Sequence, residues 1–168
     1  KIKNKKQYGI DTKIKEDDFY SLRQMSIDTK NKNVLNQILE YDSKVNGYPT
    51  QTHMLFVYNK EIDDFGKADY FANKMLNSKD DFENRVLKAN LDFYYDFYVN
   101  DLKDVEKGIT FFEKGKKDFK DNQLEFSYFI AKASIENNTR KRLGKTTLKY
   151  CMKNYKKNRY FREIDLKN

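Results

Sequence analysis

Few residues of this chain have the types and spacing that catalysis or metal binding requires. His53 is the only histidine, Cys151 is the only cysteine, and 98 positions separate them. A Cys–His nucleophile would therefore form only if the fold brought the two side chains together. We expect His53 to be a partly buried or surface residue and Cys151 to be a small core residue. No catalytic, metal or cofactor site is predicted, and we expect the chain not to be an enzyme.

Two further patterns suggest chemistry but have simpler explanations. Gly144-Lys145-Thr146-Thr147 is similar to part of a phosphate-binding loop, but the motif requires an earlier glycine after a strand, and position 139 is threonine. The pattern therefore does not predict a nucleotide site. Paired aspartates stand where helices are expected to begin, and acidic residues there cap free amides and complement the helix dipole. These pairs are Asp17-Asp18, Asp63-Asp64 and Asp80-Asp81.

The strongest functional signal is the basic segment 140–162. If Leu143, Leu148 and Met152 face inward, the basic side chains must lie on the outside of the helix. Such a surface can attract nucleic-acid phosphates, anionic lipids or an acidic partner. The alternative is a solvated face with no partner. The candidate surface residues are Lys141, Arg142, Lys145, Lys149, Lys153, Lys156 and Arg159.

The net charge of +8 is unevenly distributed along the 168 residues. Residues 1–32 carry a net +4 and residues 139–168 a net +9, which leaves −5 for residues 33–138. An acidic body with two basic ends is therefore expected. No apolar run is long enough to span a bilayer. A single cysteine fits a reducing compartment, so we expect a cytoplasmic protein.

Apolar residues recur at helical spacing along most of the chain, and no stretch alternates with period two for long enough to indicate a strand. One proline and six glycines leave few helix breakers. We predict an all-α fold of about eight helices joined by short turns. The expected ranges are 17–28, 33–45, 50–61, 65–77, 80–99, 101–118, 121–136 and 140–157.

The two helices over 80–99 and 101–118 are predicted to fold back on each other as a hairpin, around which the rest is organised. The first is apolar on more than one side, which is typical of a helix buried between neighbours. Its tyrosines can either fill the core or line a groove for a peptide, because tyrosine is enriched in recognition surfaces. The groove candidates are Asn90, Tyr94, Tyr95 and Tyr98.

Three of the predicted helices share a pattern of a small residue, a bulky residue four positions later and a small or adaptable one seven positions later. Small residues let two helices approach closely, and the bulky one fills the gap to the next hairpin. The three sets, at intervals of 40 and 36 residues, are Ala68–Ala72–Met75, Gly108–Phe112–Gly115 and Gly144–Leu148–Cys151.

This pattern resembles the second helix of the tetratricopeptide repeat (TPR), with a degenerate match over residues 50–157. The first-helix signature of that family is largely missing, since Lys132 stands where its glycine would be. The resemblance implies an α-solenoid of stacked antiparallel hairpins with a concave, peptide-binding face. Related degenerate repeats occur in bacterial peptide-binding regulators. The alternative is an irregular helical bundle that contains one similar hairpin.

Taken together, these observations predict a basic tail or linker over 1–15 and a single helical-repeat domain over 16–168. We expect it to bind a protein or peptide segment, with nucleic-acid binding through 140–162 as the alternative. Because residue 1 is lysine, we expect the chain to be part of a longer bacterial regulatory or membrane-associated protein. In the membrane-associated case, Lys1–Lys6 would be the basic flank of a preceding transmembrane segment. The oligomeric state is left open.

Overall fold

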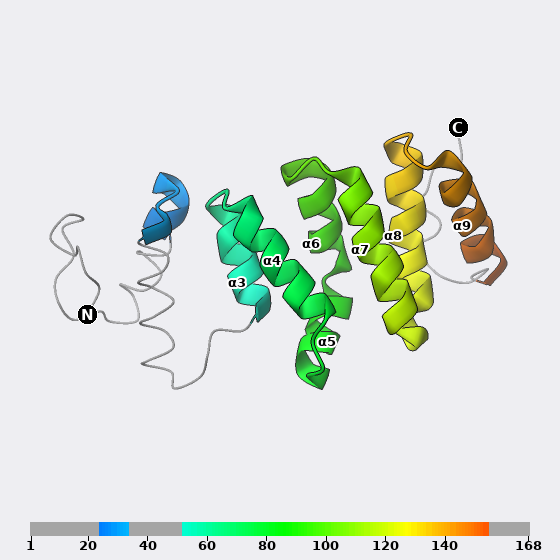
Figure 1. The fold of residues 1–168 in the computed structure, drawn as a ribbon, viewed down its shortest axis with the longest axis horizontal. Helices are drawn as coiled ribbons and strands as arrows, with labels where there is room; N and C mark the ends of the chain where they lie inside the picture. The colour runs from blue at the N-terminus through cyan, green and yellow to red at the C-terminus, as the bar shows by residue number, and fades with distance from the viewer. Residues whose placement is uncertain (1–23, 34–51, 155–168) are drawn as a thin grey trace, which may run out of the picture. The chain divides into compact units, whose positions relative to one another are not determined.

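The computed structural model describes residues 24–33 and 52–154 (Figure 1). All regular structure in these residues is helical, with no strand, which confirms the predicted all-α class for them. The chain divides into two compact units, Lys1–Asn77 and Ser78–Asn168. The single domain over 16–168 stays a prediction, and the helix expected at 33–45 lies almost wholly outside the described residues.

The first unit contains a helical hairpin made by α3 (Thr52–Glu61) and α4 (Phe65–Leu76). The Asp64 carboxylate accepts a hydrogen bond from the Lys67 amide at 3.3 Å, so the second of the paired aspartates caps α4 as predicted. Ala68 and Ala72 are fully buried. These small side chains let the two helices pack closely together.

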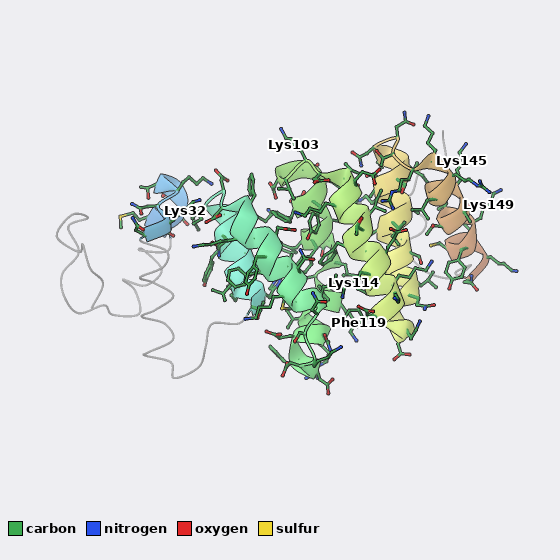
Figure 2. The ribbon with its side chains drawn as sticks, in the orientation of Figure 1. Lys32, Lys103, Lys114, Phe119, Lys145 and Lys149 are labelled. Atoms are coloured by element: carbon green, nitrogen blue, oxygen red, sulfur yellow. The ribbon has the colours of Figure 1, made fainter. Side chains whose placement is uncertain are left out.

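A helical stretch over residues 24–29 precedes this hairpin and is joined to its turn by ion pairs. The Lys30 ammonium lies 3.2 Å from the Asp63 carboxylate, and the Lys32 ammonium lies 3.2 Å from that of Asp64. Lys32 is labelled in Figure 2. These pairs are partly exposed, so each contributes only about 0.2–1 kcal/mol.

The second unit is a series of helices that run back and forth, as α6 to α9 do in Figure 1. A π-helical segment, η2, continues α6, and a short 3₁₀ turn, η3, leads into α8. The helix α7 packs along α8, and α8 packs along α9. The bounds are α5 Asp81–Ala89, α6 Leu91–Asp96, η2 Phe97–Asp101, α7 Val105–Asp118, η3 Lys120–Asn122, α8 Gln123–Glu136 and α9 Lys141–Asn154.

The prediction of one continuous helix over 80–99 was wrong. Asn90 adopts a non-helical conformation and its side-chain amide donates to the Val86 carbonyl at 2.7 Å, which ends α5. After α6 the backbone widens, and the Leu102 amide donates to the Phe97 carbonyl five residues earlier. Lys103 then takes a positive φ of 56° before α7 begins. The sequence predicts a turn of two residues between the helices over 80–99 and 101–118. The structure instead has the π segment η2 and a connection that reaches α7 at Val105.

An aromatic core holds α6, α7 and α8 together. The Tyr94 ring stacks on Phe111 with centroids 5.4 Å apart, and Phe112 stacks on Phe129 at 5.2 Å. Phe126 is fully buried and contacts Phe112 at 6.4 Å. Large aromatic side chains bury much apolar area each, so they compensate for an apolar fraction of only 38%.

Three glycines stand where helices of the second unit come closest. A Cβ on Gly108 would lie 2.8 Å from the Tyr98 Cβ, and one on Gly144 would lie 2.7 Å from the Ser134 Cβ. A Cβ on Gly115 would lie 2.0 Å from the Phe126 ring. The expectation that these small residues permit close helix packing is therefore confirmed at all three positions.

Candidate functional site

The exposed side of α9 carries a basic face made of Lys141, Arg142, Lys145, Lys149 and Lys153, all of which are exposed. The opposite side buries Gly144, Thr147, Leu148 and Cys151 against α8. Figure 2 shows Lys149 pointing away from α8. Lys156 and Arg159 lie outside the described residues, so their place in the predicted stripe stays a prediction.

Met152 does not face inward as expected, because 46% of its surface is exposed. It lies at one edge of the basic face, whereas Tyr150, 39% exposed, lies at the other edge. The Lys116 ammonium, on α7, sits 5.0 Å from the centre of the Tyr150 ring. This contact brings a cation from a second helix to the margin of the basic face.

The five cations of the basic face have no ion-pair partner among the described residues. No acidic residue occurs anywhere in 140–154. Arg140, just before α9, differs from them. Its Nε lies 2.7 Å from a Glu106 oxygen and its Nη1 lies 2.9 Å from a Glu113 oxygen, so this cation is used to join α9 to α7. Two neighbouring carboxylates raise the pKa of Arg140.

The four predicted groove residues do not form one surface. Tyr94 and Tyr98 are fully buried, and the pKa of Tyr94 is raised by this burial and by the Glu83 carboxylate. Asn90 is half-buried and caps α5. Tyr95 is also buried, but its hydroxyl donates a hydrogen bond to the exposed residue Glu136. Tyr94 and Tyr98 thus lie in the core, in keeping with the alternative role considered for them.

The Tyr95 hydroxyl takes part in a polar cluster on the face shared by α6 and α8. It donates to Glu136 Oε2 at 2.5 Å, and the Lys132 ammonium lies 4.7 Å from the centre of its ring. Burial first, and then the Glu136 contact, raise the pKa of Tyr95. Neither Lys132 nor Glu136 was predicted from the sequence as a site residue. Their i, i+4 spacing was the available signal, but such pairs are common on helices.

The two residues first considered for catalysis, His53 and Cys151, belong to different units of the chain. His53 is half-buried on α3, and burial lowers its pKa. Cys151 is fully buried on α9, and burial raises its pKa to about 11, which disfavours the reactive thiolate. Asp80, like Asp64, accepts a hydrogen bond from the first turn of its helix, whereas Asp17-Asp18 lie outside the described residues. Within residues 24–33 and 52–154, no three metal-ligating side chains cluster.

Comparisons with known proteins identify no relative of this chain: no family model, no curated protein and no solved structure matches it. Among the helices that the structure describes, none is both long enough and apolar enough to cross a bilayer. The two candidate sites are therefore the basic face of α9 and the polar cluster between α6 and α8, each known from its geometry alone.

Proposed function

We propose that this chain is a non-enzymatic, TPR-like module that binds a protein or peptide segment. The observation that carries the proposal is a two-layer order in the second unit. In a TPR-like stack, the first helices of successive hairpins adjoin each other, and so do the second helices. Here Tyr95 of α6 contacts Phe129 of α8 with ring centres 5.6 Å apart. Lys116 of α7 contacts Tyr150 of α9.

In this proposal α6 and α7 form one hairpin, and α8 and α9 form the next. The concave face of such an array is lined by the first helices, which here are α6 and α8. The exposed residues Asp92 and Asp96 of α6 and Glu136 of α8 would then surround the Lys132–Tyr95 pair. We call these residues the α6–α8 face.

The α6–α8 face has side chains already held in place before a ligand arrives. Glu136 is fixed by the Tyr95 hydroxyl, and Asp96 accepts a hydrogen bond from the Asn100 amide at 2.6 Å. Preorganised groups lose less conformational entropy on binding, which favours affinity. With three carboxylates and one ammonium, the face suits an extended peptide that supplies basic side chains and backbone groups.

The proposal is tested by selecting random short peptides on the immobilised protein and measuring the dissociation constants of the enriched peptides by fluorescence anisotropy. We expect Asp96→Asn and Glu136→Gln each to weaken binding by about tenfold, or ~1.4 kcal/mol. Lys149→Gln on α9 is the matched control and should leave these constants unchanged.

Enriched peptides that bind all three variants as they bind the parent protein would contradict the assignment of the α6–α8 face. A selection that enriches no peptide would contradict the proposed function itself. Circular dichroism of each variant ensures that a loss of binding is not a loss of fold.

A further inference from the structure

We propose that the basic face of α9 binds the phosphate backbone of nucleic acid without reading its sequence. This surface is separate from the α6–α8 face, and the inference does not depend on the peptide-binding proposal. It is carried by five exposed cations on one side of a helix whose other side is packed on α8.

The spacing of the cations suits a regular row of phosphates. Arg142, Lys145, Lys149 and Lys153 follow one another at intervals of three or four residues, so they form one stripe along the helix. Four residues advance an α-helix by about 6 Å. Along the duplex axis each strand carries one phosphate about every 3.4 Å, so the phosphates are dense enough for several cations of this stripe to meet one each.

The cations of the basic face also differ from the neighbouring Arg140. None of the five is joined to a carboxylate in the part of the chain that the structure describes, whereas Arg140 beside them is held by Glu106 and Glu113. The rest of the described second unit, residues 78–139, has thirteen acidic and ten basic residues. Positive charge is thus concentrated on α9 rather than spread over the unit. When such cations neutralise phosphates, the counterions that surround the nucleic acid are released, and this release favours binding.

The apolar side of α9 is already packed on α8 rather than turned toward a lipid surface. A membrane-surface helix needs a contiguous apolar face turned toward the lipid, but the apolar face of α9 is packed against α8. Its two exposed large side chains, Tyr150 and Met152, lie at opposite edges of the basic stripe. Four of the five cations are lysines, which act as point charges and so suit phosphate contacts that do not depend on base sequence.

The test measures binding of a fluorescein-labelled, mixed-sequence DNA duplex by anisotropy between about 50 and about 200 mM salt. The variant Arg142→Gln/Lys149→Gln/Lys153→Gln removes three cations while keeping good helix formers. We expect the slope of log affinity against log salt to become shallower by about 2.7, or ~0.9 for each phosphate that is no longer neutralised. Affinity at the lowest salt should fall by about tenfold or more.

The matched control is Lys79→Gln/Lys103→Gln/Lys120→Gln, which removes the same charge from exposed positions outside α9. Figure 2 shows Lys103 at the turn before α7, far along the helix series from Lys149. The control should keep the parent slope to within about one unit. Equal reductions in slope and affinity in the two triple variants would show that only net charge matters and would overturn the proposal.

Two further probes decide the class of partner. Poly-glutamate and vesicles that contain phosphatidylserine are titrated under the same conditions. Binding of either one as tightly as the duplex would assign the face to acidic polypeptides or to lipid, and would overturn the proposal. Weaker binding of both, together with the variant-specific change in slope, would support it.

Discussion

Tyr94 lies in an environment that strongly favours its neutral form. The ring is fully buried and stacked on Phe111, and the nearby Glu83 carboxylate adds to the effect of burial. Both effects raise the pKa of the phenol above its ordinary value of 10.0. The folded state therefore binds the Tyr94 proton more tightly than the unfolded state does. Because of this difference, the free energy of unfolding changes with pH in the alkaline range.

The sign of this link gives a prediction. Stability from Tyr94 is complete below about pH 10 and is lost as the pH rises toward the higher pKa of the folded state. Urea unfolding at several pH values should show the free energy of unfolding falling above about pH 10. In Tyr94→Phe this fall should be shallower by up to ~1.4 kcal/mol per pH unit. Identical slopes in the two proteins would contradict the assignment, and the difference at pH 7 gives the pH-independent cost.

At the same residue scale, sequence and structure agree best where one residue sets a local geometry. The capping roles of Asp64 and Asp80 followed from their position before an apolar periodic segment, and each carboxylate accepts the expected amide. The orientation of Met152 could not be predicted in this way. Its side chain lies at the margin of the apolar face, where the width of the contact with α8 decides its exposure.

At the scale of helices, close packing of α7 on α8 depends on Gly115. A methyl group there would lie 2.0 Å from Phe126, whose ring is fully buried and stacked against Phe119. Alanine normally stabilises a helix by about 1 kcal/mol relative to glycine. The expected clash costs more than that, because overpacking a core typically costs about 1–3 kcal/mol.

We therefore predict that Gly115→Ala lowers the free energy of unfolding by up to about 2 kcal/mol, measured by urea denaturation followed by circular dichroism. Gly66→Ala is the control, since the only atom near its added Cβ is an Asp64 oxygen at 4.0 Å. That substitution should be neutral or stabilising. Stabilisation by Gly115→Ala would show that Phe126 moves aside at little cost.

Helix existence was predictable from periodicity, but the interruption after Ala89 was not. Apolar residues continue through Asn90 into α6 at helical spacing, so the pattern resembles one long helix. The break coincides with the non-helical conformation of Asn90, and the later π segment begins with Phe97 and Tyr98, which are fully buried in the core. Local breaks of this kind do not change the periodic spacing of apolar residues in the sequence. The same limit kept Lys132 and Glu136 out of the predicted groove, although their neighbour Tyr95 was among its candidates.

At the scale of the whole chain, the second unit contains its own core. Its largest fully buried side chains include Tyr94, Phe112 and Phe126, and their ring partners lie within residues 78–154. We predict that a fragment of residues 78–168 folds by itself and unfolds cooperatively, with a free energy near 5 kcal/mol, roughly the lower end for a domain of its size. Circular dichroism during urea denaturation measures this, and a broad, non-cooperative transition would contradict it.

The uneven charge of this unit has an electrical consequence. Acidic residues outnumber basic ones over α5 to α8, whereas every charged residue of α9 is basic. Because the two signs of charge are separated along the unit, it carries a permanent dipole moment. A polyanion would exert a torque on it before any contact and turn the end that bears α9 toward itself. The α6–α8 face, on different helix surfaces, would remain open after such docking. If both proposals hold, the unit could carry a polyanion on α9 and a peptide on the α6–α8 face at the same time.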